Sequence, residues 1–508
     1  FVDLVVDVGD HDHAPVAVGH VGHPELGVGL RRAVAGQRAL VREAGQVGGA
    51  REAAVGRQVE VVGPGRGGFA GAHLVLALRD ARVRVTLIDR NVYKTFQPLL
   101  YQVATAGLNS GDVTMFLRGL SLHAPNMRFR QGEVTGIDTD DQVVKLSDGG
   151  SVRYDHLVLA NGATTNYFGT PGAEEFAMPM YTRSQALEIR ERIFAELERA
   201  TQLTEMSFTD RLAISIVGGG PTGVEIAGAL ADFRISELDV LYPEVDPGTL
   251  EISLIQRGDE LLKAFEPQHR EYAARELEKR GVTLRLGQGV EEVGYDFVRL
   301  ADGSYVESDI TIWAAGVSVS TSVNAWGFPQ GRGGRIDVDP TLRVKGYDNV
   351  WAAGDIAGGD DPQPQLAQPA VQMGQHVARA IKALVEGDEA AAQKPFHYND
   401  LGAMATIGRR AAIAELPGGV NLQGSIGWLA WLGVHVSKLL GTRNRRSVAA
   451  NLLYLYNGTG ISRVPNPVVG DVDSLGARRA FRENAPIRRF GYQAGKRFKD
   501  PGRPRMRR

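Results

Sequence analysis

Short apolar runs recur along the chain, and stretches with helical spacing of apolar positions separate them. The clearest runs are Val59–Val62, Val83–Ile88, Leu212–Val217, Ile252–Ile255, Ile310–Val317 and Asn349–Ala353. Apolar runs of this length are typical of strands buried on both faces of a parallel sheet. The region from Gln372 to Val385 has the spacing of a long helix. This alternation predicts an α/β fold built on parallel sheets.

A glycine-rich turn follows the first run. Gly63, Gly65 and Gly68 fit the pattern G-x-G-x-x-G, and a helical pattern begins directly after them. Such a turn lets a pyrophosphate approach the backbone at a helix N-terminus, where unpaired N–H groups favour negative charge. The next strand ends at Asp89, at the separation where a carboxylate binds ribose hydroxyls. The segment therefore predicts a dinucleotide site.

The same unit occurs a second time. Gly218, Gly220 and Gly223 form another glycine turn, but the following strand ends at Gln256 and Arg257 instead of an acid. A carboxylate there would repel the 2′-phosphate of NADPH, whereas Gln removes the repulsion and Arg pairs with phosphate. Alternatively, Gln256 bonds the ribose and Arg257 points to solvent. We expect two dinucleotides, a flavin and a nicotinamide, with NADH ahead of NADPH.

Further strand ends carry residues suited to a cofactor. Asn161 and Gly162 follow one apolar strand, Gly316 ends another, and Gly354 with Asp355 ends a third. A carboxylate at the carboxyl end of a strand can reach a flavin's polyol, although a helix N-cap is the alternative role for Asp355. We expect these five residues at the cofactor sites.

Composition narrows the chemistry. The 508 residues include 57 Lys and Arg against 59 Asp and Glu, so bulk charge gives no reason to expect nucleic-acid binding. None is cysteine, which excludes disulfides, thiolate metal sites and a redox cysteine pair. Electrons would have to pass through a bound organic cofactor. The N-terminal histidines have no organised acidic partners, and we expect no metal site.

The patterns also predict how the chain is divided. Residues 1–57 contain no Ile, Lys, Asn, Ser, Thr, Tyr or Met, and we expect a misassigned start or a disordered extension. Two Rossmann-like domains follow, the second inserted in the first, and then a C-terminal region and a basic tail. The expected boundaries are 58–170 and 330–395 for the first domain, 171–329 for the second, 396–460 for the C-terminal region and 461–508 for the tail.

Longer motifs add a family resemblance. They are Phe96–Thr105, Gly220–Glu225, Ala367–Gln372, Tyr398–Asp400 and Met404–Arg409. With the glycine turns, they resemble the type II NADH dehydrogenases, single-chain respiratory NADH:quinone oxidoreductases of the two-dinucleotide-binding-domain flavoprotein superfamily. The resemblance covers roughly residues 58–456.

Each glycine turn, with the start of the helix that follows it, is called a cradle. The resemblance implies that FAD binds in the first cradle (Gly63, Gly65 and Gly68) and that NADH, with NADPH as the alternative, binds over the second (Gly218, Gly220 and Gly223). It implies that Asp89 binds the adenosine ribose of FAD and that Asp355 binds its ribityl or phosphate side. Glu225 would lie near the nicotinamide, although a Glu at a helix N-terminus is also favoured by the dipole alone. The remaining implied contacts are Gln97 at the cofactor and Gln368 and Gln372 on the quinone side.

The C-terminal region contains the apolar stretch 426–440, which includes two Trp and is followed by Arg443, Arg445 and Arg446. It is too short to span a bilayer. We expect a helix lying in one leaflet, with the Trp side chains at headgroup level and the arginines near anionic lipid. A buried helix or a dimer interface is the alternative.

These observations predict a peripheral enzyme on the cytoplasmic face of the cell membrane. It would pass a hydride from NADH to FAD and two electrons to a membrane quinone, without pumping protons, and the resemblance allows a homodimer. Two other functions stay open: a soluble flavoprotein reductase of a protein acceptor such as a ferredoxin, and a non-catalytic redox-sensing flavoprotein.

Overall fold

The computed structural model describes residues 57–62, 68–201 and 211–457. The unusual segment before residue 57, the basic tail 461–508 and the cradle residues Gly63 and Gly65 lie outside these ranges. Expectations for them therefore stay predictions.

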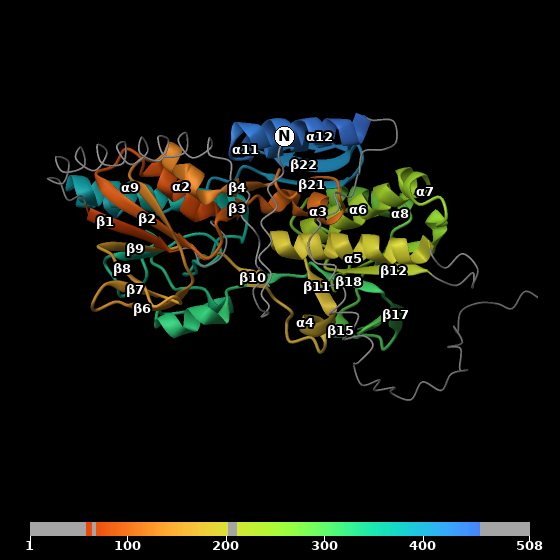
Figure 1. Ribbon diagram of the computed structural model, residues 1–508, viewed down its shortest axis with the longest axis horizontal. Helices are drawn as coiled ribbons and strands as arrows, with labels where there is room; N and C mark the ends of the chain where they lie inside the picture. The colour runs from red at the N-terminus through yellow and green to blue at the C-terminus, as the bar shows by residue number, and fades with distance from the viewer. Residues whose placement is uncertain (1–56, 63–67, 202–210, 458–508) are drawn as a thin grey trace, which may run out of the picture. The chain divides into compact units, whose positions relative to one another are not determined.

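The first sheet contains five strands in the order β20-β9-β1-β2-β5, and the pairs β20–β9, β9–β1 and β2–β5 are parallel; β1, β2 and β9 are labelled in Figure 1. These strands are β1 (Arg57–Val62), β2 (Val83–Asp89), β5 (Met127–Gln131), β9 (His156–Leu159) and β20 (Val350–Ala352). The strands β9 and β20 are buried at every residue, as expected where both faces of a parallel sheet are covered. This burial on both faces explains why the sequences of these strands are apolar runs.

Helices α2 (Phe69–Ala77) and α9 (Ala367–Glu386) lie against each other beside this sheet (Figure 1). An antiparallel meander also contributes to its core, through Val134, Val144 and Leu146. The meander consists of β6 (Val134–Asp138), β7 (Val143–Leu146) and β8 (Ser151–Arg153).

A second sheet repeats this plan, in the order β11-β18-β12-β13-β14, and all its strands are parallel. Its strands are β11 (Ala177–Pro179), β12 (Leu212–Val217), β13 (Leu250–Ile255), β14 (Thr283–Arg285) and β18 (Ile310–Trp313). Its helices are α5 (Arg183–Thr201), α6 (Pro221–Ser236) and α8 (Pro267–Lys279), and its meander is β15 (Val290–Val293), β16 (Phe297–Leu300) and β17 (Tyr305–Glu307). The expected α/β fold with two Rossmann-like units is confirmed.

The two units are joined by a pair of short antiparallel strands, β10 (Thr164–Thr165) and β19 (Val317–Ser318). After β19 the chain returns to the first core at once, because Val319, Val323 and Trp326 are buried in it. These three residues lie before residue 330, where the second part of the first domain was predicted to begin.

The C-terminal region is a three-stranded antiparallel sheet followed by two helices. The elements are β21 (Ala403–Gly408), β22 (Ala411–Leu416), β23 (Val420–Gln423), α11 (Gly424–Lys438) and α12 (Thr442–Asn457). Helix α11 packs on β22 (Figure 1), so closely that a Cβ added at Gly427 would lie 2.7 Å from the carbonyl oxygen of Ala412. In the described part of the chain, no helix combines the length and apolar character needed to cross a bilayer.

The expectation that the Trp side chains of this region lie at headgroup level is wrong. Trp428 and Trp431 are buried against the core, and the outward face of α11 instead carries Ile426, Leu429 and Val434. The error arises because a helix with apolar residues on most of its circumference does not reveal from sequence which face packs inward.

The remaining elements connect these units. They are β3 (Tyr93–Thr95), η2 (Gln97–Leu99), α3 (Leu100–Ala104), β4 (Thr114–Phe116), η3 (Leu117–Leu122), α4 (Ala173–Phe176), α7 (Leu238–Leu241), η4 (Pro247–Thr249), η5 (Thr321–Trp326), η6 (Arg332–Gly334) and α10 (Glu389–Ala392).

The close packing of α2 on α9 yields a stability prediction. A Cβ added at Gly374 would lie 2.3 Å from the backbone oxygen of Ala70, so Gly374→Ala must separate the helices, at a cost of about 1–3 kcal/mol. Gly433→Ala, where a Cβ would meet no heavy atom within 4 Å, is the matched control and gains roughly 0.5–1 kcal/mol from helix propensity. Thermal melting checks this: a midpoint for Gly374→Ala at or above that of the control would contradict the prediction.

Candidate functional site

The first cradle lies where β1 leads into α2. Gly68 is the residue before the helix and has extended backbone, and no side chain caps the helix N-terminus. A Cβ on Gly68 would lie 3.5 Å from the carbonyl oxygen of Ala160, so the helix start lies close to the end of β9. The helix N-terminus is therefore positioned to bind an anion through its backbone N–H groups.

Residues predicted for the first dinucleotide gather at this edge of the sheet. Asp89 ends β2, is fully buried, and accepts a 2.7 Å hydrogen bond from the backbone N–H of Asn91. The Oδ1 atom of Asn161 is buried and has no hydrogen-bond partner in the described part of the chain. Gly162 and Gly354 both have positive φ, of 68° and 82°. A buried acceptor without a partner beside an uncapped helix start fits a bound dinucleotide that supplies the missing bond.

Asp355 and Gln97 lie around the same cradle. Asp355 accepts a 3.5 Å hydrogen bond from the Tyr181 hydroxyl, and its backbone oxygen accepts one from Gln365. Gln97 begins η2 and is half-buried. The preceding Phe96 contacts Phe69, the first residue of α2, with ring centroids 5.8 Å apart. The segment that begins at Phe96 therefore lies beside the cradle helix.

The second cradle shows a different role for each of its glycines. A Cβ on Gly218, which has φ 113°, would lie 2.6 Å from the carbonyl oxygen of Ala314, and one on Gly223 would lie 1.8 Å from the oxygen of Gly218. A Cβ on Gly220 would meet nothing within 4 Å. Two glycines thus permit the tight turn and the helix packing, and the third leaves open space for a ligand.

At the end of β13, Gln256 bonds to the protein itself. Its Oε1 accepts a 2.8 Å hydrogen bond from the backbone N–H of Gly219 in the second cradle. Arg257 is exposed and makes no hydrogen bond or ion pair with the described residues. At Gly316, a Cβ would lie 2.7 Å from the Phe168 ring, so that aromatic side chain covers the glycine.

Glu225 lies in α6, beyond the second cradle, and is buried. Burial raises the pKa of its carboxyl well above the ordinary value, and a hydrogen bond from the backbone N–H of Thr406 in β21 opposes this only in part. The Thr406 hydroxyl is 2.9 Å from the Tyr101 hydroxyl, and the Tyr101 ring contacts Trp431 of α11. Burial thus favours the neutral form of the Glu225 carboxyl. A short chain of contacts links this residue to the C-terminal helices.

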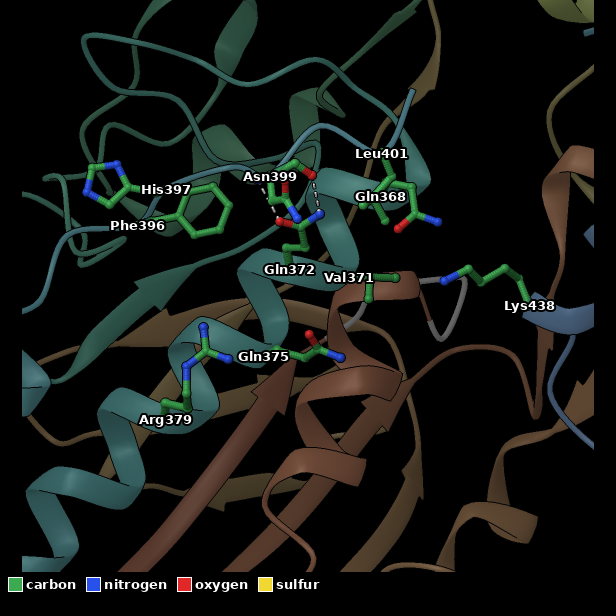
Figure 2. A pocket seen from close by; sticks show the side chains of 10 residues that line it. All are labelled: Gln368, Val371, Gln372, Gln375, Arg379, Phe396, His397, Asn399, Leu401 and Lys438. Atoms are coloured by element: carbon green, nitrogen blue, oxygen red, sulfur yellow. Dashed lines mark hydrogen bonds between the residues drawn. The ribbon is translucent and has the colours of Figure 1, made fainter. Parts of the chain in front are cut away.

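Gln368 and Gln372 line a cavity of about 360 Å³ (Figure 2). The backbone N–H of Asn399 donates to Gln372 Oε1 at 2.9 Å, and Gln372 Nε2 donates to the Asn399 carbonyl oxygen at 2.8 Å. Gln372 therefore holds the segment around Asn399 against α9. Gln368, in contrast, makes no hydrogen bond with the described residues. The structure brings together both predicted glutamines at one wall of the cavity.

Sequence reasoning missed other residues of this cavity. Gln375 and Arg379 continue the same face of α9, one and two turns after Gln372, and Lys438 reaches the cavity from the end of α11 (Figure 2). The sequence could have indicated the residues on α9, because residues three or four positions apart lie on the same face of a helix. This spacing separates Gln368, Gln372, Gln375 and Arg379. Nothing in the local sequence indicates the approach of Lys438.

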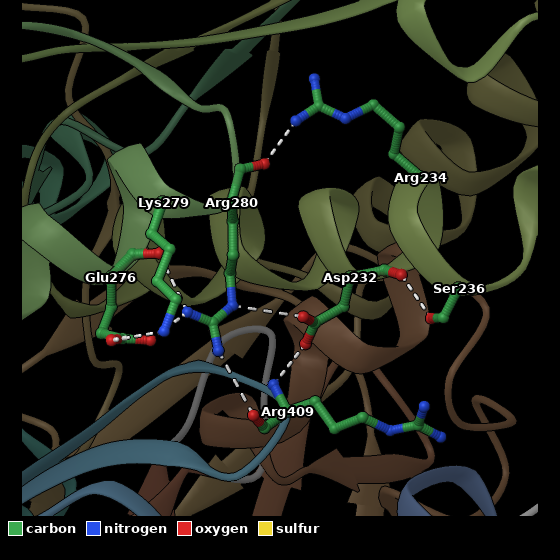
Figure 3. Close-up of polar contacts among 7 residues, drawn as sticks. All are labelled: Asp232, Arg234, Ser236, Glu276, Lys279, Arg280 and Arg409. Atoms are coloured by element: carbon green, nitrogen blue, oxygen red, sulfur yellow. Dashed lines mark hydrogen bonds and ion pairs between the residues drawn. The ribbon is translucent and has the colours of Figure 1, made fainter.

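A polar network joins the C-terminal sheet to α6 and α8 (Figure 3). Asp232 of α6 accepts hydrogen bonds from the backbone N–H of Arg409 and, at 3.3 Å, from Arg280 Nε. Arg280 also pairs with Glu276 and donates to the Arg409 carbonyl oxygen at 3.3 Å. The turn between β21 and β22 is therefore held by side chains of the second nucleotide unit.

Comparisons with known proteins agree with this architecture. Residues 57–374 match the family model described as pyridine nucleotide-disulphide oxidoreductase, and residues 401–455 match the NDH2 C-terminal domain. The type II NADH:quinone oxidoreductase NdhA of Mycobacterium tuberculosis is 37% identical over 406 residues, covering 77% of this chain and 86% of that protein. The mitochondrial internal alternative NAD(P)H-ubiquinone oxidoreductase A1 of Arabidopsis thaliana is 30% identical over 78% of this chain and 84% of its own length.

Solved structures share the fold at low sequence identity. NDH2 from Plasmodium falciparum in complex with NADH has a TM-score of 0.73 and 21% identity, over 79% of this chain and 99% of that one. The sulfide:quinone oxidoreductase of Aquifex aeolicus has a TM-score of 0.62 and 17% identity, over 79% and 95%. Since this chain has no cysteine, the fold that it shares with disulfide-type oxidoreductases does not carry their thiol chemistry.

The raised pKa of Glu225 predicts a pH-dependent stability difference. The folded Glu225 carboxyl ionises at a higher pH than the unfolded side chain, which ionises above about pH 4.3, so its contribution to stability falls as pH rises above that value. The Gln side chain of the Glu225→Gln variant cannot ionise, so the variant does not lose stability in this way as pH rises. The melting midpoint of the variant, relative to the unchanged chain, should therefore rise between pH 5 and pH 8. Glu271→Gln, on the exposed surface of α8, is the control, and a flat difference for Glu225→Gln would contradict the prediction.

Proposed function

Because this chain belongs to the type II NADH:quinone oxidoreductase family, we propose that it transfers a hydride from NADH to FAD and then two electrons to a membrane quinone, without pumping protons. The family resemblance predicted from the motifs is thereby confirmed, and the chain is an oxidoreductase of this class. The observation that carries the finer proposal is the presence of two separate nucleotide cradles in a chain without cysteine. Electrons need an organic carrier between the two substrates.

The first cradle is the proposed FAD site. The free N–H groups at the start of α2 would bind the pyrophosphate, with Gly63, Gly65 and Gly68 allowing its approach, and Asp89 would bind the adenosine ribose. Asn161, whose buried Oδ1 has no partner among the described residues, supplies an acceptor for a hydrogen-bond donor of the cofactor. Asp355 completes the set on the ribityl side. A bound flavin supplies the redox chemistry by accepting a hydride and releasing two electrons.

The second cradle is the proposed NADH site. The open space at Gly220 suits close approach of a pyrophosphate, and Gly218 and Gly223 shape the turn that presents it. Gln256 Nε2, which makes no hydrogen bond with the described residues, can donate to a ribose hydroxyl while Oε1 binds Gly219. The exposed Arg257 provides a cation for a 2′-phosphate, so NADPH is the alternative donor. Gly316, at the end of β18, faces the same ligand in this proposal.

Glu225 and the two glutamines have distinct proposed roles. A protonated Glu225 presents a neutral carboxyl to the nicotinamide, because a buried carboxylate would need a compensating charge. Gln368, whose amide makes no hydrogen bond with the described residues, offers this amide to a quinone oxygen. Gln372 acts indirectly, by holding the Asn399 segment against α9. The protein contributes orientation and exclusion of water, and these side chains define where each substrate would lie.

The outward face of the C-terminal helices is the proposed membrane contact. Ile426 and Leu429 are 67% and 59% exposed on α11, and Arg443, Arg445 and Arg446 are exposed at the start of α12. Exposed apolar groups beside a basic cluster suit the surface of an anionic bilayer. We place the enzyme as a peripheral protein on the cytoplasmic face of the cell membrane, and a homodimer is compatible with this arrangement.

An anaerobic flavin titration tests the proposed function. The purified chain, reconstituted with FAD, should be yellow, should bleach with one equivalent of NADH more readily than with NADPH, and should regain its absorbance when a short-chain quinone is added. Reoxidation by ferredoxin but not by quinone would favour a soluble reductase. A flavin that NADH does not bleach would favour a redox-sensing protein, and a chain that binds no FAD would end the proposal.

Membrane binding is tested by flotation with vesicles. Burying Leu429 is worth about 1.5–3 kcal/mol, so Leu429→Glu should reduce flotation with phosphatidylserine-containing vesicles at least tenfold. Replacing the three arginines by Gln should remove the preference for anionic over neutral lipid, at roughly 1 kcal/mol each. Tyr305→Glu, at an exposed position of β17, is the matched control. Equal flotation of Leu429→Glu and the control would place the contact elsewhere.

A further inference from the structure

A buried lysine lies beside the first cradle. Lys94, in the middle of β3, is only 4% exposed, and it lies opposite Met115 in the antiparallel pairing with β4. Burial lowers the pKa of its ammonium group to about 7. A lysine is rarely buried to this extent unless it is paired with an opposite charge.

No such charge lies near it in the described part of the chain. The Lys94 Nζ atom is 4.2 Å from the centre of the Phe69 ring, and no described oxygen forms a hydrogen bond or ion pair with it. A cation over an aromatic face is attracted by the ring, but this attraction is weaker than the hydration that an ammonium loses on full burial. The described residues alone therefore leave this cation incompletely compensated.

The titratable groups around Lys94 do not supply an anion. His73 donates its Nδ1 proton to the Phe69 carbonyl oxygen, and its pKa falls to about 4 because of burial, then Lys94, with a smaller effect of Lys438. His435, whose ring contacts Phe96, has a pKa lowered to about 4 by burial. The neighbouring groups are neutral or positive at pH 7, so an anion that binds here meets no repulsion from them.

The position of the ammonium connects it to the cradle. Phe69 is the first residue of the nine-residue helix α2 and follows Gly68 directly. The first turn of α2 contains no acidic residue, and no side chain caps its N-terminus. A helix start that no described side chain caps and a buried ammonium without a counter-charge among the described residues thus lie together, and both favour a negatively charged ligand.

We propose that Lys94 is the charge partner of the dinucleotide in the first cradle: an anionic group of the bound cofactor takes the place of a carboxylate that none of the described residues provides. This inference rests on the proposed FAD site. A dinucleotide flavin has two sources of negative charge, the pyrophosphate, which is always ionised, and the isoalloxazine ring, which becomes an anion when reduced and deprotonated. Both sources would present a negative charge to Lys94. Substitution of Lys94 changes the affinity for FAD and ADP if the pyrophosphate is the partner, and the midpoint potential if the reduced ring is the partner.

The test compares Lys94→Met with the unchanged full-length chain. Met keeps the length and apolar stem of lysine but removes the charge. Binding of FAD and of ADP to the deflavinated protein is measured by titration calorimetry, and the midpoint potential of the bound flavin by spectroelectrochemistry. Lys382→Met, which removes an exposed α9 lysine paired with Glu386, is the control and should leave all three quantities unchanged.

Two results support the proposal. If the pyrophosphate is the partner, Lys94→Met weakens FAD and ADP binding by the same factor, tenfold or more, and leaves the potential unchanged. If the reduced ring is the partner, ADP binding is unchanged and the midpoint potential falls, by about 30 mV for each tenfold preference for the reduced form that is lost. In both cases thermal melting should show a more stable flavin-free protein, and in the first case it should also show a smaller stabilisation by FAD.

The proposal is overturned if Lys94→Met binds FAD and ADP as tightly as the unchanged chain with the same potential. Failure of the unchanged chain to bind FAD would instead refute the proposed function. Should Lys94→Met not fold, Lys94→Gln gives the same uncharged comparison with a polar end group, and Lys94→Arg, which keeps the charge, should restore most of the affinity. Equal FAD affinity together with an equal midpoint potential in Lys94→Gln and Lys94→Arg would also overturn the proposal.

Discussion

The packing of strand β21 against helix α6 is the constraint on which the rest of the molecule depends. A Cβ on Gly228 of α6 would lie 2.0 Å from the carbonyl oxygen of Ile407, so the helix and the strand are in backbone contact. The same helix begins at the second cradle, and the same strand begins the sheet that supports α11. A shift of the C-terminal region would therefore move the nucleotide cradle with it, because nothing flexible separates the two elements.

Polar groups fix the register of this packing on both sides of the backbone contact. Glu225, three residues before Gly228, accepts the N–H of Thr406, and Asp232, four residues after it, accepts the N–H of Arg409. Each bond ties a backbone donor of the C-terminal sheet to a side chain of α6, so a slip of the strand would break both bonds. The raised pKa favours the neutral form of the Glu225 carboxyl, and a neutral carboxyl is buried at a lower free-energy cost than a carboxylate.

Local patterns were enough to predict the two sheets and their glycine turns. A parallel strand buried on both faces must be apolar, and a turn beneath a pyrophosphate must be glycine, so these requirements are visible residue by residue. Contacts between distant segments were not visible. Gln372 bonds to Asn399, Gln256 to Gly219, and Lys94 lies over Phe69, and each pairing depends on how separate elements meet. For the same reason the orientation of Trp428 and Trp431 was predicted wrongly.

The two cradles differ at the strand end, and the difference is consistent with the different ligands proposed for them. Asp89, at the first cradle, is a fully buried carboxylate, and such a group is stable only where donors surround it permanently. Gln256, at the second, is a half-buried neutral amide that satisfies its own acceptor through Gly219. A cofactor that stays bound can complete the hydrogen bonding of a buried charge, whereas a substrate that leaves in every turnover cannot. The Gln256 amide oxygen keeps its hydrogen bond to Gly219 when the nucleotide leaves, so the empty site pays only a small free-energy penalty. A site that binds NADH and releases NAD⁺ in every turnover requires this property.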